Sequence, residues 1–576
     1  MTENNAQLSA ENPEIGYVIG GGLEANLQVR LNVPAQQVQD GAFVVMDSGT
    51  WRFYGLVTDL QLGATDERFA NELNSRRFAP ALADHLDRQT LFTNLAVMPS
   101  LMLDRRPEPG SPEYAQWIQA HQDKLAPLPV KTVPAHHSTV RLADRADIAQ
   151  IFGEEDNEKV FRIGETREQG HAVCLDLDRF VQRSAGIFGT TGSGKSFLAR
   201  MILAGLIHAD HASALIFDMH NEYGPDTTAS DTGKPAFGLK GKFGSKVRLV
   251  GLGSKTQFGQ LKADFSLEIS HQDITPEDVL LLTETLNLRE TSATTLDALQ
   301  SSFGTSWFTR FMAMKVGATE IGEDGKKTPT PDSVAFWARA NGVNEMAAEG
   351  LHSKLVRVNK LPYLVKAPAS NGLDEIINNL ENGKHVVLSF GSYDNELDYL
   401  LVTNLITRKI RDAWVEKTND FHSKNKNKEP RPLVVVVEEA HKLLSRDMAS
   451  QTIFSTIARE MRKYYVTLLI IDQRPSQIYD EVMSQLGTRI CGLLGDEDDI
   501  NAVLAGLAGK QALRGMLSKL QAKEEALMLG WGVPMPIPIR SRRYDTQFWV
   551  DLLGKEKEPD SMQGAIAKMG YEDDPD

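Results

Sequence analysis

The chain has 576 residues, of which 41% are hydrophobic and 24% charged, a balance typical of a soluble globular protein with two or three domains. Its formal net charge of −15 argues against a protein that coats nucleic acid with its whole surface, although a local basic channel is compatible with it. No apolar run approaches the ~20 residues of a membrane span, and the polar first residues lack the apolar core of a signal peptide.

The chain has two cysteines, Cys174 and Cys491, which lie in apolar surroundings and far apart in the sequence. This usage favours two buried, reduced thiols over a disulfide framework or a metal site. We therefore expect a cytoplasmic protein.

The N-terminal part of the chain predicts a small β-barrel. Residues 1–14 are polar and are expected to form a disordered tail. From residue 15 onward, short apolar runs are separated by turns rich in glycine and proline. The predicted strands lie at 27–33, 43–46, 51–57, 95–98 and 130–133. We expect a barrel domain over residues 15–145, with a helical interruption near 66–75.

The most informative stretch of the chain has the form G-x-x-x-x-G-K-S. It consists of Gly189, Thr190, Thr191, Gly192, Ser193, Gly194, Lys195 and Ser196. Residues 185–188 before it predict a buried strand, and residues 197–206, beginning with Phe197, predict an apolar helix. In this arrangement backbone N–H groups and the positive end of the helix face one phosphate group. Lys195 can then reach the β- and γ-phosphates, and the Ser196 hydroxyl can ligate Mg²⁺, so we predict a site for ATP and Mg²⁺.

A second predicted strand, 214–217, is followed by a cluster of polar residues. Ligands bind at the carboxyl ends of parallel strands in α/β sheets, so Asp218 and Glu222 are candidate nucleotide-binding residues. Residues 224–248 then carry several lysines, among them Lys240 and Lys242. This segment is either a solvated loop or a nucleic-acid contact.

Residues 275–382 read as a helical insertion between strands of the core. Thr275 is a suitable N-cap, Pro276 suits the first helical position, and two acids follow. Strands of the sheet resume at 385–390.

A second strong motif follows the insertion. Residues 433–437 are five apolar residues that predict a central parallel strand, and the strand ends in Glu438 and Glu439. Glu438 is expected to hold the magnesium ion with its water shell, and Glu439 to orient or deprotonate the attacking water. A further buried strand at 466–471 ends just before Gln473, which can bind the γ-phosphate or that water.

Near the C-terminus, a strand is predicted at 526–529, followed by a segment at 533–540 with proline at every second position. Each proline removes an N–H donor on the same side, so the segment is expected to be an edge strand or an extended strap. We assign residues 546–576 to a C-terminal tail.

With these residues identified, the chain resembles the HerA branch of the HerA–FtsK superfamily of ring-forming P-loop ATPases, which are often described as DNA helicases. The motifs that carry the resemblance are GTTGSGKS, IFDMHNEYG, VVVVEEAH, AREMRK and IDQRPS, in the order found in the family. The long interval between Ser196 and Glu438, filled by the helical insertion, is also typical of this branch and differs from DEAH-box helicases.

The resemblance implies an α/β fold. It predicts a RecA-like P-loop NTPase core with a parallel sheet at 146–274 and 383–545, a small β-barrel of the HAS type at 15–145, and the helical insertion at 275–382. It also implies a homo-hexamer with nucleotide at the subunit interfaces, double-stranded DNA in the pore, and a C-terminal strap that reaches a neighbouring subunit. In such a ring Arg462, or alternatively Arg459, is a candidate arginine finger for the neighbour's γ-phosphate.

The favoured function is therefore an ATP-driven DNA translocase or helicase. By resemblance it works with a partner, either a NurA-like nuclease or another effector such as a sirtuin-like NADase, in DNA end processing or anti-phage defence. One alternative is a hexameric scaffold that uses ATP to organise such an effector. Another is an ATPase of the conjugation or packaging type.

Overall fold

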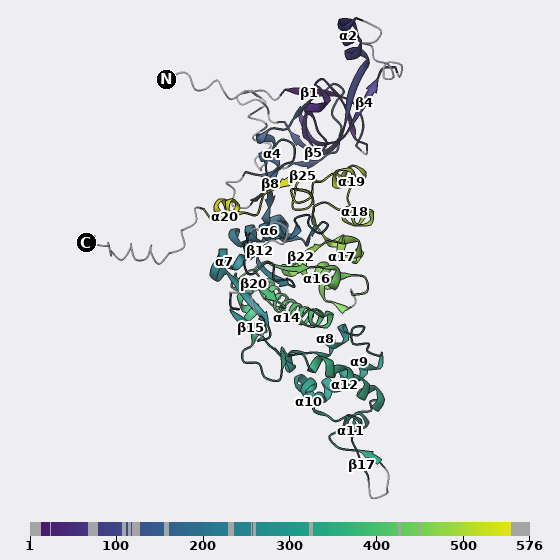
Figure 1. Cartoon of the computed structure of the whole chain (residues 1–576), viewed down its shortest axis with the longest axis vertical. Helices are drawn as coiled ribbons and strands as arrows, with labels where there is room; N and C mark the ends of the chain where they lie inside the picture. The colour runs from purple at the N-terminus through teal and green to yellow at the C-terminus, as the bar shows by residue number, and fades with distance from the viewer. Residues whose placement is uncertain are drawn as a thin grey trace, which may run out of the picture.

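The computed structural model describes residues 13–554, apart from 24, 67–78, 106, 108–110, 113, 115–116, 118–126, 155–159, 229–234, 255, 257–260, 322–326, 424–427 and 449–450. The helical interruption predicted near 66–75 lies outside these residues from 67 onward. The molecule is elongated, with a β-barrel at one end, a helical lobe at the other and a large sheet between them (Figure 1).

The barrel is built from the N-terminal strands. They are β1 (Glu14–Gly20), β2 (Leu27–Leu31), β3 (Phe43–Ser48), β4 (Trp51–Ala64), β5 (Leu91–Asp104), β6 (Leu128–Pro129) and β7 (Thr139–Leu142). Their order is β2-β1-β7-β3-β4-β5-β6, and pairing of β2 with β5 closes six strands into a barrel to which β6 is added. Val29, Val44 and Val97 fill the interior, each fully buried. The predicted barrel is confirmed, although the strand expected at 130–133 lies slightly earlier, as β6.

The central sheet has twelve strands in the order β15-β14-β20-β11-β21-β22-β10-β23-β24-β25-β8-β9. Those that carry the nucleotide motifs are β10 (Ala185–Phe188), β11 (Ser213–Asp218), β21 (Leu433–Glu438) and β22 (Val466–Asp472). The others are β8 (Val160–Thr166), β9 (Ala172–Asp176), β14 (Val247–Leu252), β15 (Phe265–Leu267), β20 (His385–Ser389), β23 (Thr488–Cys491), β24 (Glu525–Gly530) and β25 (Ile537–Ser541). The strands from β15 to β23 pair in parallel, and the last four are antiparallel.

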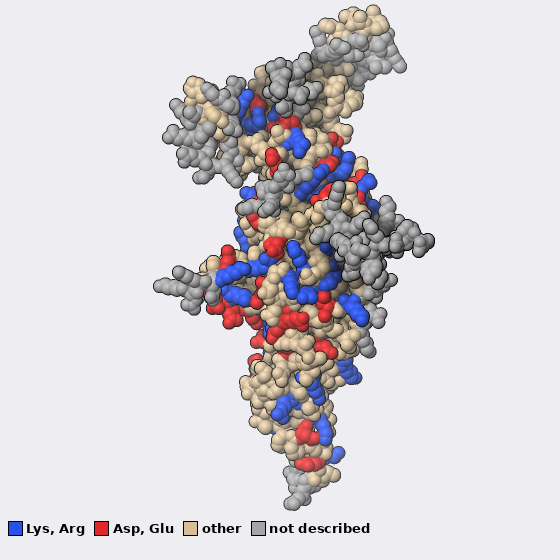
Figure 2. All heavy atoms as spheres, turned by 90° about the vertical axis from the view of Figure 1, so that its left-hand side faces the viewer, with Lys and Arg blue, Asp and Glu red and all other residues tan. Residues whose placement is uncertain are grey.

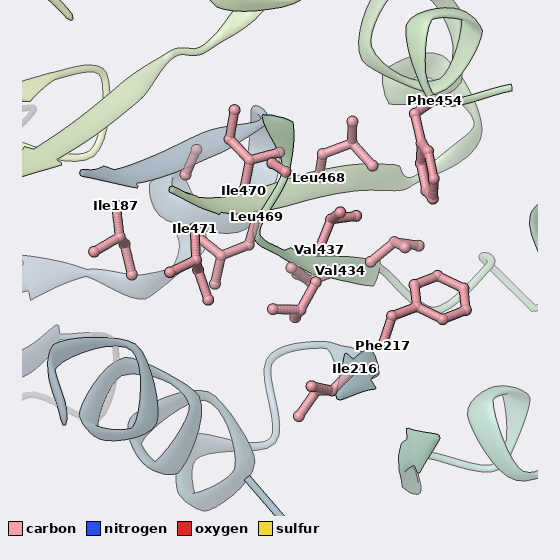
Figure 3. Close-up of a cluster of buried hydrophobic side chains, with 14 of the residues drawn as sticks. Ile187, Ile216, Phe217, Val434, Val437, Phe454, Leu468, Leu469, Ile470 and Ile471 are labelled. Carbon is pink, nitrogen blue, oxygen red and sulfur yellow. The ribbon is translucent and has the colours of Figure 1, made fainter. Parts of the chain in front are cut away.

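Both faces of the parallel part are covered, which explains why its strands are apolar on both sides. Figure 3 shows Ile187, Ile216, Val437 and Leu469 within one packed cluster, and all four are fully buried. The helix α6 (Lys195–Ala209) follows β10, and the long helix α14 (Glu396–His422) precedes β21. The predicted α/β core with a parallel sheet is confirmed.

The helical insertion forms the lobe farthest from the barrel (Figure 1). Its helices are α8 (Pro276–Leu281), α9 (Thr291–Phe303), α10 (Trp307–Ala313), α11 (Val334–Ala340) and α12 (Glu345–Asn359). As expected, Thr275 caps α8, and its side chain and that of Asp278 form a capping box. The buried Asp278 also binds Arg408 of α14, with an N–O distance of 2.9 Å, which ties the lobe to the core. The next helix, α13 (Gly372–Glu381), packs against α14, β20 and β11 and so returns the chain to the sheet.

The proline-rich segment near the C-terminus corrects the sequence-based expectation. Its strand, β25, is internal, because it pairs with β24 on one side and with β8 on the other. Pairing with β8 begins at Ile539, after the last proline, and the carbonyl of Pro538 accepts a hydrogen bond from the N–H of Arg167. The missing donors therefore do not interrupt the ladder, and this segment is neither an edge strand nor a strap that leaves the subunit.

Residues 546–553, which we assigned to the C-terminal tail, form the helix α20 (Thr546–Leu553). Asp545 caps the helix, and Phe548 and Trp549 are buried as α20 packs against α6. Cys174 and Cys491 are buried free thiols, as predicted. Over the described parts of the chain, no helix is long and apolar enough to cross a membrane.

Candidate nucleotide-binding site

The glycine-rich turn lies between β10 and α6, where the sequence placed it. Gly194 has a φ of 94°, in the left-handed region, and is the N-cap of α6. At Gly189 a Cβ atom would lie 2.4 Å from the Ser193 hydroxyl oxygen, so a larger residue would require the Ser193 side chain to move. The turn therefore presents its backbone at the N-terminus of a helix fifteen residues long.

Lys195 lies near acidic residues that end or follow three other strands. Its ammonium group donates to the carbonyl of Thr190 at 3.0 Å. Burial lowers the pKa of Lys195, whereas the charges of Glu439, Asp472, Glu438 and Glu222 act to raise it. The fold thus gathers into one place four acids that are spread over most of the core sequence.

Glu438 ends β21 and is buried, with one carboxylate oxygen 3.5 Å from the hydroxyl of Tyr223. The other oxygen, Oε2, is buried without a hydrogen-bond partner among the described residues. Burial, together with the charges of Asp218, Glu222 and Glu439, raises the pKa of Glu438 to about 9. A divalent cation would supply both the missing partner and the missing positive charge.

These residues fit Mg²⁺ as an ion held jointly with phosphate groups. In the described parts of the chain no group of three or more His, Cys, Asp or Glu side chains could hold a metal by itself. Magnesium commonly uses one or two protein ligands together with water and nucleotide phosphates. Ser196, in the first turn of α6, and Glu438 are the residues that could provide those ligands.

Asp218 has a structural position rather than one facing a ligand. It is fully buried, and its oxygens accept hydrogen bonds from the backbone N–H groups of Glu222, Tyr223 and Gly224. It therefore shapes the turn after β11 that carries Glu222. Glu222 is partly exposed, and its Oε2 lies 3.9 Å from a guanidinium nitrogen of Arg200.

Glu439 and Gln473 meet above the phosphate loop. The strand β22 lies between β10 and β21, so the residues at its end reach both neighbours. The hydroxyl of Thr191 donates to Gln473 Oε1 at 2.6 Å, and Gln473 Nε2 donates to Glu439 Oε2 at 3.3 Å. Glu439 has a φ of 47°, a left-handed conformation that is unfavourable for a residue with a side chain and recurs at functional sites.

Beside the phosphate loop is a cavity of about 480 Å³. Phe197, Leu198 and Met201 of α6 line one side, and residues 540–546 line another. The ring of Tyr544 lies 6.1 Å from that of Phe197, and its hydroxyl donates to the carbonyl of Phe237. Sequence reasoning identified Phe197 but missed Tyr544, because nothing in the local pattern around residue 544 shows that it lies next to α6.

The two candidate finger arginines lie away from the phosphate loop of their own subunit. The strands β10 and β22 are parallel; the loop follows the end of β10, whereas both arginines precede the start of β22. Arg459 pairs with Glu481 at 2.9 Å, and Arg462 is exposed. Burial lowers the pKa of Arg183, and the positive charge of Arg462 lowers it further. These two guanidinium groups therefore lie near each other.

Two lysines of the 224–248 segment, Lys240 and Lys242, contact the rest of the core. They lie in a short helix, α7 (Leu239–Phe243). The ammonium group of Lys240 lies 2.8 Å from Asp264 and 2.8 Å from the carbonyl of Val247, and that of Lys242 lies 4.5 Å from the ring centre of Phe237. These contacts give Lys240 a structural role in the subunit.

A glycine-rich turn between a buried parallel strand and a helix, with acids at the end of a second strand, defines the P-loop nucleoside triphosphatase fold. Residues 161–410 match a family model described as "Helicase HerA, central domain". A protein of Sulfolobus acidocaldarius named "DNA double-strand break repair helicase HerA" is 24% identical over 548 residues, which cover 92% of this chain and 93% of the relative. A protein of the same name from Saccharolobus solfataricus is 24% identical over 570 residues, covering 97% of this chain and 99% of the relative. The resemblance to the HerA family is thus confirmed.

Solved structures with a similar fold include VirB4 of Thermoanaerobacter pseudethanolicus. It is 16% identical, with a TM-score of 0.42, and the match covers 68% of this chain and 98% of that one. The conjugative coupling protein TrwB is 12% identical, with a TM-score of 0.44, over 70% of this chain and 92% of that one.

Proposed function

We propose that this protein is an ATPase of the HerA type that couples ATP hydrolysis to movement along double-stranded DNA. The observation that carries the proposal is the hydrogen-bonded chain from Thr191 through Gln473 to Glu439. A protein that only binds nucleotide needs the phosphate loop, but it does not need a carboxylate held beside it. Positioned acids of this kind orient or activate a water molecule.

Each residue has a distinct role in the proposed reaction. The loop backbone and Lys195 hold the β- and γ-phosphates, and Ser196 and Glu438 hold Mg²⁺, which supplies positive charge to the phosphates when bound. Glu439 accepts the proton of the attacking water or orients it, and Gln473 keeps the carboxylate of Glu439 in place. The cavity between Phe197 and Tyr544 receives the base and the ribose.

The DNA partner is proposed from the relatives, whose names describe repair helicases. On the face in Figure 2, basic and acidic side chains of the described residues are interspersed over the core, and no surface of one sign covers it. Contact with DNA is therefore expected at a local basic channel, which a homo-hexameric ring with DNA in its pore would provide.

We further propose that the protein acts with a separate effector, a NurA-like nuclease or a sirtuin-like NADase, in DNA end processing or anti-phage defence. The support is the family resemblance, together with the lack of a recognisable nuclease or NADase motif in the sequence. Co-purification with the product of the neighbouring gene tests this partner.

The decisive experiment measures ATP hydrolysis in Mg²⁺ with and without linear double-stranded DNA, at low and high salt. DNA should raise the rate, and the stimulation should fall steeply with salt, because contacts to the phosphate backbone release counterions. The Lys195→Ala variant should be inactive under every condition, which excludes a contaminating ATPase. An ATPase rate that DNA does not change at low salt would contradict the motor function and favour the scaffold alternative.

A further inference from the structure

His441 is the first residue of α15 (His441–Leu444) and lies only a few positions after Glu438, which ends β21, and Glu439, which follows it. Its backbone N–H and its ring Nδ1 lie 2.7 Å and 2.9 Å from the same oxygen, Oδ2, of Asp472. Asp472 is fully buried, and its other oxygen accepts the backbone N–H of Arg474 at 2.6 Å. Burial and these hydrogen bonds fix the carboxylate of Asp472, which therefore holds the imidazole in one orientation.

The same ring nitrogen also faces the proposed catalytic acid. Nδ1 of His441 lies 3.6 Å from Glu439 Oε2, the oxygen that accepts the hydrogen bond of Gln473. Nδ1 of the imidazole therefore faces two carboxylates: the buried Asp472, which is within hydrogen-bond distance, and the partly exposed Glu439, whose contact is electrostatic. The hydrogen bond to Asp472 raises the pKa of His441, and the charge of Glu439 acts in the same direction, against burial and Lys442.

We propose that His441 is a positioning residue for hydrolysis, which Asp472 orients and which holds the carboxylate of Glu439 toward the phosphate loop. The inference rests on the proposed function, since Glu439 acts on water only if ATP is hydrolysed here. Without the ring, Glu439 keeps the contact from Gln473 but loses the imidazole that faces the same oxygen. The carboxylate can then turn away from the water, although the phosphate loop that binds the nucleotide is unchanged.

The position of His441 also links two strand ends. Asp472 ends β22 and lies next to Gln473, whereas Glu439 follows β21 directly. Gln473, which follows β22, and the imidazole, which the last residue of β22 holds, both face the same oxygen of Glu439. This double contact is what distinguishes the proposed role from that of a histidine that only stabilises the fold.

The test compares His441→Ala with His441→Asn, whose side-chain amide can place a donor near the position of Nδ1. His441→Ala should lower kcat by about 10²-fold, since a small misplacement of a reacting group has an effect of that order. The affinity for a non-hydrolysable ATP analogue should stay unchanged, and His441→Asn should recover most of the lost rate. His422→Ala, an exposed histidine at the end of α14, is the matched control and should hydrolyse ATP at the wild-type rate.

A combined variant separates positioning from simple stabilisation. In a Glu439→Gln background, His441→Ala should lower kcat little further, because both changes act through the same carboxylate. The inference is overturned if His441→Ala hydrolyses ATP at the wild-type rate, or if the Ala and Asn variants lose the same activity together with thermal stability. If Glu439→Gln itself leaves the rate unchanged, the proposed function of the site fails instead.

Discussion

At the scale of single residues, two adjacent acids have different environments. Glu438 is buried beside Tyr223, and one of its oxygens has no hydrogen-bond partner within the described part of the chain. Glu439 instead leaves the strand in a left-handed conformation and contacts Gln473. The first environment suits a cation, because burial disfavours a lone negative charge. The second leaves the carboxylate partly accessible, as the acceptor of a proton from water must be.

We expect the two acids to respond differently to the same isosteric change. Glu439→Gln should leave ATP binding intact and lower kcat by about 10²- to 10⁴-fold, because the attacking water loses its proton acceptor. Glu438→Gln should instead weaken the Mg²⁺ dependence of nucleotide binding. Both quantities are measured by steady-state hydrolysis and by titration with an ATP analogue, with and without Mg²⁺.

The exposed Glu320→Gln in the helical insertion provides a control and should match the wild type in both measurements. Identical effects of the two changes at 438 and 439 would show that the acids do not have separate roles.

At the scale of elements, the site depends on which strands are neighbours. The strand β22 separates the phosphate-loop strand β10 from the acid strand β21, so that Gln473 can bridge Thr191 and Glu439. At the other side of the loop, β25 and the residues after it bring Tyr544 to α6, and α20 packs on the same helix. The C-terminal part of the chain therefore supports the nucleotide site from within the subunit.

Removal of a large buried side chain from α20 should destabilise this support. Trp549 is fully buried and contacts Phe243, Tyr544 and Phe548. Trp549→Ala should lower the free energy of unfolding by about 3–5 kcal/mol, since it leaves a cavity that the surroundings fill only in part. Denaturant or thermal unfolding measures the loss, and Leu553→Ala, exposed on the same helix, serves as the comparison. A loss no larger than that of Leu553→Ala would show that α20 does not contribute to the stability of the core.

At the scale of the whole molecule, one subunit separates its own phosphate loop from its candidate finger. Arg462 is exposed at the end of the parallel strands opposite to the loop, and Arg459 is already paired with Glu481. A cation beyond Lys195 and magnesium is needed for the charge that develops on the transferred phosphoryl group. A second copy of the chain that presents Arg462 to the loop would supply that charge.

The shared site predicts rescue between two inactive variants. Lys195→Ala and Arg462→Ala should each hydrolyse little ATP alone, because a finger is worth roughly 10³–10⁵ in rate. In the proposed ring, a mixture would contain interfaces where an intact Lys195 meets an intact Arg462 from the next subunit, so hydrolysis should return in the mixture. The measurement is ATPase rate against mixing ratio, together with a check that the subunits exchange. Mixtures that exchange subunits and stay inactive at every ratio would exclude Arg462 as the finger.

Many elements of the fold and of the candidate site could be predicted from local sequence patterns. The phosphate loop, the strand that ends in Glu438, the capped start of α8 and the barrel strands β2 to β5 were predicted, because residue type and periodicity are visible within a few positions. The short barrel strands β1 and β7 were not among the predicted strands. The proline-rich segment shows where such patterns fail. Proline removes a donor wherever it lies, but whether that donor would have been used depends on where β8 begins to pair, which is not a local property.

The tertiary structure decided which of the candidate residues meet. Thr191 and Gln473 are separated by 282 positions, yet they form a hydrogen bond because the strand order places their loops side by side. The same strand order brings His441 to Asp472. Asp218, in contrast, binds the backbone of the turn that follows it. The sequence by itself therefore determined the chemistry that each motif can perform. The packing of β22 between β10 and β21 determined which motifs perform it together, because contacts between distant parts of a chain depend on how whole elements pack.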